Sequence, residues 1–309
     1  MKKILAAGMS ALAILSLTAC SSAGQSSADS QQSAQAQPTT AAVVSQDKGV
    51  NQMSFTAPEA YKTVERYIEK YSDGKFAEKD ITYNFEDESS ICYACMFGIT
   101  LADEIPLEKT TAAEYNGVSY QMYETGKNEC AFLQKDADAY AIRYKFADSI
   151  DKEKFDKVMA NVKFTENADL TDNNIEFDGI QYTLDSTLNV YCTTSTLKET
   201  PDGTAVEKRL SWKFGKDKDN EDFAFVIAEY KNTTVEQQLK KDKKYEQKQV
   251  GSITYTVRAD SDGKPYEYYT QHGSDVYLIR NNGKSGFVTT RSDKSVEAFE
   301  KLLSTISFK

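Results

Sequence analysis

The most reactive spacing in the sequence is a pair of cysteines. Cys92-Tyr93-Ala94-Cys95 has the C-x-x-C pattern that redox-active sites use. A reactive pair of this kind needs the N-terminus of a helix, where the dipole stabilises the thiolate. These cysteines lie instead in ICYACMFGI (91–99), whose apolar composition predicts a central strand. Because side chains three apart point to opposite faces of a strand, we expect no redox dithiol here.

The remaining cysteine chemistry leaves two alternatives open. Either the thiols are buried and structural, or Cys130 forms a disulfide with Cys92 or Cys95. Cys192 is the only cysteine of the second half and is expected to be free. A zinc site would need four ligands, whereas the chain contains one histidine, His272. We therefore expect no metal and no cofactor.

No pattern in the sequence specifies a reaction. His272 lies in the Tyr-rich segment EYYTQHGSDVY (267–277), where the sequence predicts an exposed turn. As a general base it would need a nucleophile and an orienting acid beside it. The chain also lacks a Gly-rich phosphate loop, a G-x-S-x-G motif and a calcium loop. We expect a non-catalytic protein, with an enzyme of unrecognised type as the alternative.

The 19 tyrosines suggest a different kind of chemistry. Exposed aromatic rings can stack on sugars, so a Tyr-lined face could bind carbohydrate or peptidoglycan. Tyr266, Tyr268 and Tyr269 are the candidate binding surface, since they cluster before a predicted strand. Alternating strands also use tyrosine for packing, and this is the competing interpretation.

The elements that must position these residues are mostly strands. Alternating or continuous apolar segments predict strands at ITYNF, ICYACMFGI, GVSYQMY, AYAIRYKF, LSWKF, DFAFVIAEY, SITYTV and VYLIR, and NVYCTTSTLKET is predicted to be extended.

Helices are predicted at three places. Apolar residues recur at i, i+3, i+4 and i+7 from Phe155 and again from Phe299. The expected N-caps of these two helices are Ser149 or Asp151, and Asp293 or Ser295. A third helix is expected from Pro58 to Ser72, with Tyr61, Val64, Ile68 and Tyr71 forming one stripe.

Three blocks of sequence occur twice in the same order. They are SDGKFAEKDITYNF (72–85) and PDGTAVEKRLSWKF (201–214), DAYAIR (138–143) and DVYLIR (275–280), and FDKVMANVKF (155–164) and FEKLLSTISF (299–308). The repeat predicts two copies of one domain, at residues 51–168 and 170–309. Strands followed by helices predict an α+β fold, in which each copy is an antiparallel sheet domain with packed helices.

The N-terminus has the features of an export signal. Lys2 and Lys3 precede thirteen apolar or small residues, ILAAGMSALAILS, too few to cross a bilayer as a stable helix. Leu17-Thr18-Ala19-Cys20 resembles the lipobox of bacterial lipoproteins. The resemblance implies a signal peptide at 1–19, a lipidated Cys20 carrying acyl chains such as palmitate, and attachment to the extracytoplasmic face of the cell membrane.

A polar segment follows the cysteine. Residues 20–50 are rich in Ser, Gln and Ala and contain no aromatic residue. Such a composition cannot bury enough apolar area to offset chain entropy, so we expect a disordered tether. Lipobox, tether and a sheet domain that closes with F-x-x-Φ-Φ-x-x-Φ-x-F (Φ aliphatic or Met) resemble lipoproteins with a PsbP-like α+β sandwich. That resemblance implies a mostly non-catalytic family.

Charge restricts the class of partner. The chain has 37 basic and 47 acidic residues, a formal net charge of −10, which disfavours nucleic-acid binding. The basic run KKDKK (240–244) is expected on a solvated surface. The sequence therefore predicts a membrane-anchored binding or assembly module whose partner is an envelope protein or polysaccharide.

Overall fold

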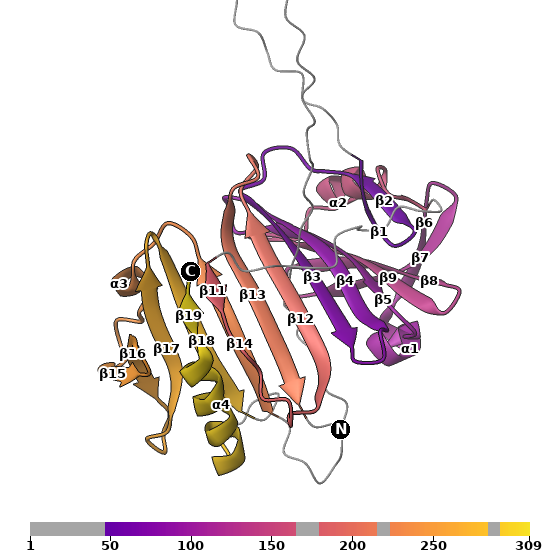
Figure 1. Cartoon of the computed structure of the whole chain (residues 1–309). Coiled ribbons are helices and arrows are strands. Elements are labelled where there is room, and N and C mark those ends of the chain that lie inside the picture. Colours follow the sequence, from indigo (N-terminus) through magenta and orange to yellow (C-terminus); the bar gives the residue numbers. More distant parts are fainter. Residues whose placement is uncertain (1–46, 165–178, 215–222, 284–290) are drawn as a thin grey trace, which may run out of the picture.

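Within the residues that the structure describes, one antiparallel sheet of fourteen strands runs through both halves of the chain (Figure 1). The computed structural model describes residues 47–164, 179–214, 223–283 and 291–309. In the first half the strands are β3 (Thr63–Tyr71), β4 (Phe76–Asn84), β5 (Ser90–Met96), β6 (Thr111–Tyr115), β7 (Val118–Thr125), β8 (Asn128–Lys135) and β9 (Asp138–Lys145). In the second half they are β12 (Val190–Glu199), β13 (Ala205–Phe214), β14 (Phe223–Tyr230), β15 (Glu246–Val250), β16 (Ile253–Ala259), β17 (Pro265–His272) and β18 (Asp275–Gly283).

The halves join through the antiparallel pairing of β3 with β12. This pairing runs from Val64 opposite Glu199 to Tyr71 opposite Cys192. Outward from it, the strand order is β3-β4-β5-β9-β8-β7-β6 on one side and β12-β13-β14-β18-β17-β16-β15 on the other. Each strand thus has a counterpart at the same place in the other half. The domain boundaries stay a prediction, because residues 165–178 lie outside the described residues.

Two helices cover one face of the sheet. They are α2 (Lys152–Met159) and α4 (Asp293–Thr305), each on the core of its own half. Figure 1 shows α4 lying over strands of the second half. Short strands flank these cores: β1 (Asp47–Val50) and β10 (Lys163–Phe164) pair with β2 (Met53–Thr56), and β11 (Ile180–Gln181) pairs with β19 (Ser307–Phe308).

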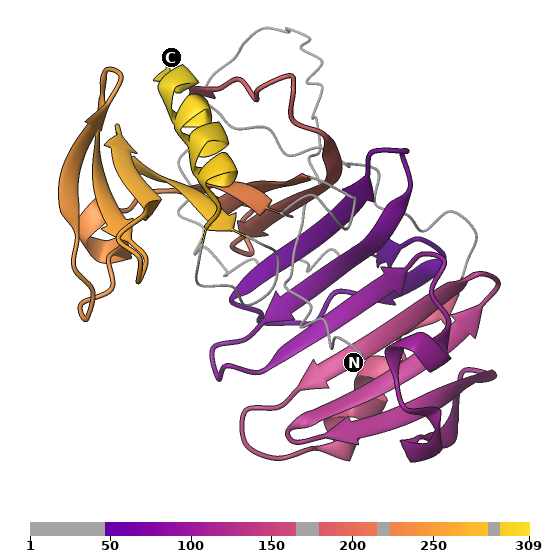
Figure 2. The same cartoon turned by 90° about the horizontal axis from the view of Figure 1, so that it is seen from below.

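The opposite face carries two smaller apolar clusters near its outer ends. They pack against the short helices α1 (Leu101–Glu104) and α3 (Val235–Gln238), and a 3-10 turn, Leu107–Lys109, follows α1. Between the two clusters, β3, β4, β12 and β13 present charged and hydroxyl side chains. Figure 2 shows the sheet from below, with the first half in indigo to magenta and the second in orange to yellow.

The predicted α+β class is wrong. Of the described residues, 53% lie in strands and 14% in helices, and the two halves share one large sheet. The expected helix from Pro58 to Ser72 is instead β3, because β4 and β12 hydrogen-bond to its two edges. Only α2 and α4 among the described elements are helices of eight residues or more.

The caps of these helices are partly as expected. Asp151 caps α2 by accepting a hydrogen bond from the backbone of Lys154. The cap of α4 is Ser292, whose hydroxyl accepts from the backbone of Ser295, so the prediction of Asp293 or Ser295 is wrong. The run 240–244 is exposed and follows α3. None of the helices in the described ranges has the length and apolar character of a membrane crossing. Cys20 and most of the tether lie outside those ranges.

Candidate binding groove at the junction of the halves

A groove of about 460 Å³ lies on the face opposite α2 and α4, across the β3–β12 junction. A volume of this size is typical of small-ligand sites, which span roughly 300–1,000 Å³. Its lining comes from both halves: Glu65, Tyr67, Thr194, Thr196, Lys198, Glu207, Arg209, Ser211, Val226, Arg280 and Asn282. No cysteine and no histidine is among these described lining residues.

Strand register explains how these side chains come together. Glu65, Lys198 and Glu207 are neighbours across β3, β12 and β13. A second row holds Asp80, Tyr67, Thr196 and Arg209, and a third runs from Glu69 through Thr194, Ser211 and Val226 to Arg280. Since side chains alternate between faces, residues two apart on each strand share the groove face. The groove is therefore a product of pairing between the halves.

Ion pairs hold most of the charges in place. Lys198 pairs with Glu65, and Arg209 pairs with Glu207 and donates to the Tyr230 hydroxyl at 3.5 Å. Lys198 and Glu65 are paired across β12 and β3, and Glu207 and Arg209 lie two residues apart on the same face of β13. The paired charges give the groove a fixed polar surface.

Tyr67 of the lining belongs to a hydrogen-bonded cluster with Glu69 and Lys213. Tyr67 donates to Glu69, and Lys213 lies 3.1 Å from both Glu69 oxygens. Burial raises the pKa of Tyr67, and the neighbouring Glu69 carboxylate raises it further. Burial also acts to raise the pKa of Glu69, but the bonds from Tyr67 and Lys213 outweigh it and lower that pKa. Glu69 is therefore held as a carboxylate and Tyr67 as a neutral phenol.

Asp80 lies beside this cluster and is 1% exposed. Burial raises the pKa of its carboxyl well above the ordinary value, and Glu78 adds to the effect while Arg143 opposes it. One of its oxygens has no hydrogen-bond partner. The counterpart of Asp80 in the second half is Arg209, because the two flank the Tyr67–Thr196 pair symmetrically.

The predicted Tyr surface is mostly interior. Tyr268 is 1% exposed and belongs to the core under α4, while Tyr269 is 5% exposed and packs on the opposite face with the α3 cluster. The prediction that all three rings are exposed is wrong. Successive residues of β17 point to opposite faces of the sheet, and both faces are covered there. The half-buried Tyr266 has the Arg291 guanidinium 4.0 Å from its ring.

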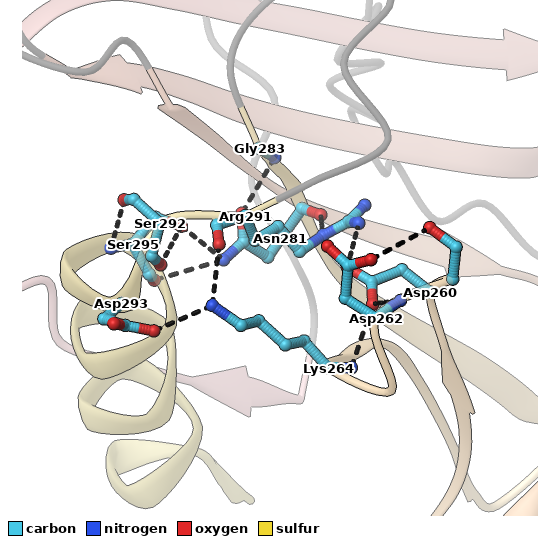
Figure 3. A network of polar contacts seen from close by, with 10 residues as sticks. Asp260, Asp262, Lys264, Asn281, Gly283, Arg291, Ser292, Asp293 and Ser295 are labelled. Atoms are coloured by element: carbon cyan, nitrogen blue, oxygen red, sulfur yellow. Dashed lines mark hydrogen bonds and ion pairs between the residues drawn. The ribbon is translucent and has the colours of Figure 1, made fainter.

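Arg291 also belongs to a polar network that fixes the start of α4 (Figure 3). Arg291 donates to Asp260 at 2.8 Å and to the Asn281 carbonyl at 2.9 Å. Lys264 donates to the Arg291 carbonyl at 3.0 Å and to Asp293 at 2.7 Å, as Figure 3 shows. The network joins the β16–β17 turn, the end of β18 and α4, so these residues have a structural role.

The other predicted chemistry-bearing residues also lie outside the groove lining. His272 is exposed at the end of β17 and stacks on Phe308. The described cysteines, at positions 92, 95, 130 and 192, are all free thiols, which excludes the disulfide alternative. Burial raises the pKa of the Cys130 thiol to about 11, so it is protonated at neutral pH. Within the described ranges, no group of three or more His, Cys, Asp or Glu could hold a metal ion.

Sequence reasoning missed every residue of the groove. A signal was present in the sequence: Glu65 and Glu69, and likewise Glu207, Arg209 and Lys213, are separated by even numbers of residues, so each set shares one face of a strand. The first segment was predicted to be a helix, in which residues two apart do not share a face.

No family model matches the chain, and no curated protein matches it. Three solved structures are similar at 8% identity. MucB in complex with MucA(peri) aligns over 81% of this chain and 93% of that chain (TM-score 0.20), and the Pseudomonas aeruginosa MucA/MucB complex over 80% and 93% (0.19). Immunity protein TplEi of the Pseudomonas aeruginosa T6SS, complexed with "L" peptide, aligns over 84% and 96% (0.23). TM-scores this low establish no common fold.

Proposed function

We propose that the chain is a lipid-anchored, extracytoplasmic, non-catalytic binding module that holds part of an envelope partner in the groove. The observation that carries this proposal is the polar groove itself, which both halves line at their junction. Charged side chains on central strands cost stability unless they are paired or hydrated. Here they occupy the middle of a face whose outer parts are apolar and covered by α1 and α3.

The N-terminal residues support the location. The lipobox resemblance at Cys20, followed by a tether of about thirty residues, suits a folded body that is held near a membrane and reaches a partner there. The lipid on Cys20 would be the contact with the membrane. A net charge of −10 disfavours nucleic acid.

A protein partner is favoured over a polysaccharide. Sugar binding rests on exposed aromatic rings, and Tyr268 and Tyr269 are buried in the sheet. Tyr67 is the only aromatic residue among the described lining. Its hydroxyl is already engaged by Glu69.

A groove-filling variant tests the proposal. Ser211→Trp places a large ring on the groove floor, whereas Thr254→Trp adds the same ring at an exposed position outside it. Both are made in the full chain with Cys20→Ser, so that no lipid holds the protein. We expect Ser211→Trp to lower retention on purified envelope by about tenfold or more, and Thr254→Trp to leave it unchanged. Equal retention of both variants, with folding verified by circular dichroism, would remove the groove as the binding site.

A further inference from the structure

Two arginines occupy equivalent places in the halves but have different partners. Arg143 and Arg280 end the repeated blocks DAYAIR and DVYLIR, on the corresponding strands β9 and β18. Arg143 donates to Glu104 at 3.0 Å and lies 3.7 Å from Glu78. Glu104 is supplied by α1. The guanidinium of the first half is therefore neutralised by the protein itself.

Arg280 lacks these partners. Among the described residues its one ion pair is with Glu267 at 3.8 Å, and Glu267 already accepts from Arg258 at 3.1 Å. The buried Nε of Arg280 has no hydrogen-bond acceptor. A guanidinium carries five N–H donors, and a buried donor that makes no hydrogen bond lowers the stability of the fold. The side chain as a whole is 31% exposed and lines the groove, so a ligand in the groove can contact it.

The charges around Arg280 favour a monoanion. The described lining holds three cations, Lys198, Arg209 and Arg280, and two carboxylates, Glu65 and Glu207. The lining side chains thus carry one excess positive charge, while the adjacent carboxylates Glu69 and Glu267 have cations of their own in Lys213 and Arg258. A carboxylate matches that excess and fits the planar fork of a guanidinium. A phosphate dianion would meet additional repulsion from the neighbouring carboxylates.

We propose that Arg280 binds a carboxylate of a peptide segment of the partner. This inference rests on the proposed function and adds the chemical class of the ligand. The peptide is favoured because hydroxyl and amide groups, from Thr194, Ser211 and Asn282, line the same groove and can bond to a peptide backbone. In the second half, the carboxylate of the ligand contacts Arg280 as Glu104 contacts Arg143 in the first half.

A matched pair of peptides tests this directly. N-acetyl-Ala-Ala-Glu-Ala-amide and its Gln counterpart differ by one carboxylate, and calorimetric titration of the full chain with Cys20→Ser compares their affinities. We expect the Glu peptide to bind about tenfold more tightly or better. Arg280→Gln should remove the preference, Arg280→Lys should retain part of it, and Lys145→Gln, which removes an exposed cation outside the groove, should leave it intact.

Several results would overturn the proposal. They are equal affinity of the two peptides, no measurable binding of either at millimolar concentration, or a preference that survives Arg280→Gln. Inorganic phosphate displacing the Glu peptide better than acetate would assign the site to phosphate instead. If Ser211→Trp abolishes envelope retention while Arg280→Gln does not affect it, the proposed function stands and the role of Arg280 falls. If neither variant changes retention, the proposed function fails as well.

Discussion

Asp80 is a carboxyl group placed where ionisation is unfavourable. Because burial raises its pKa in the folded state above the ordinary 3.8, the folded chain binds a proton more tightly than the unfolded chain. Between the unfolded-state pKa and the folded-state pKa, the free energy of unfolding therefore falls as pH rises. Asp80→Asn removes the charge and keeps the shape. We expect the melting temperature at pH 7 to rise by about 2–4 °C, which corresponds to roughly 1 kcal/mol in a chain of this size.

The control is Asp136→Asn. Asp136 is exposed and has a positive φ, a backbone conformation that asparagine also adopts. Thermal unfolding followed by circular dichroism from pH 4 to pH 8 should show the gain of Asp80→Asn shrinking toward acid pH. The control should show no such trend. A lower melting temperature for Asp80→Asn at pH 7 would mean that the native carboxyl is ionised and held by Arg143.

At the scale of elements, local pattern predicted most strands and both long helices. The periodicity from Phe155 and Phe299 specified α2 and α4, since an apolar stripe at helical spacing has one way to reach the core. The sequence of β3 is compatible with an apolar stripe of a helix and also with a strand. Its pairing with β12, from the other half of the chain, decides the outcome, and no local pattern contains that contact.

The groove was unpredictable for the same reason. Glu65, Lys198 and Arg209 are ordinary charged residues in sequence, and only the registers of β3, β12 and β13 make them neighbours. The prediction of a tyrosine surface was wrong for a different reason. Tyr268 and Tyr269 were selected by residue type, but both faces of β17 are covered, so neither ring is available.

At the scale of the whole molecule, the proposed anchor determines where the groove operates. We expect Cys20→Ser to release the chain from the membrane fraction or leave it as precursor, because the thioether to the lipid cannot form. Fractionation with radiolabelled palmitate measures both location and acylation. Cys92→Ser is the matched control, since that thiol lies within the sheet. Full membrane retention of the Cys20→Ser chain would contradict the anchor.

Partner binding at the junction of the two halves can be tested by photo-crosslinking in intact cells. Benzoylphenylalanine is placed at position 198, which holds a partly exposed lysine of the groove lining, and, separately, at position 254 outside the groove. We predict a discrete crosslinked protein from position 198 that is absent from position 254 and disappears when Ser211→Trp fills the groove. No product from position 198, or one that persists with Ser211→Trp, would contradict partner binding in the groove.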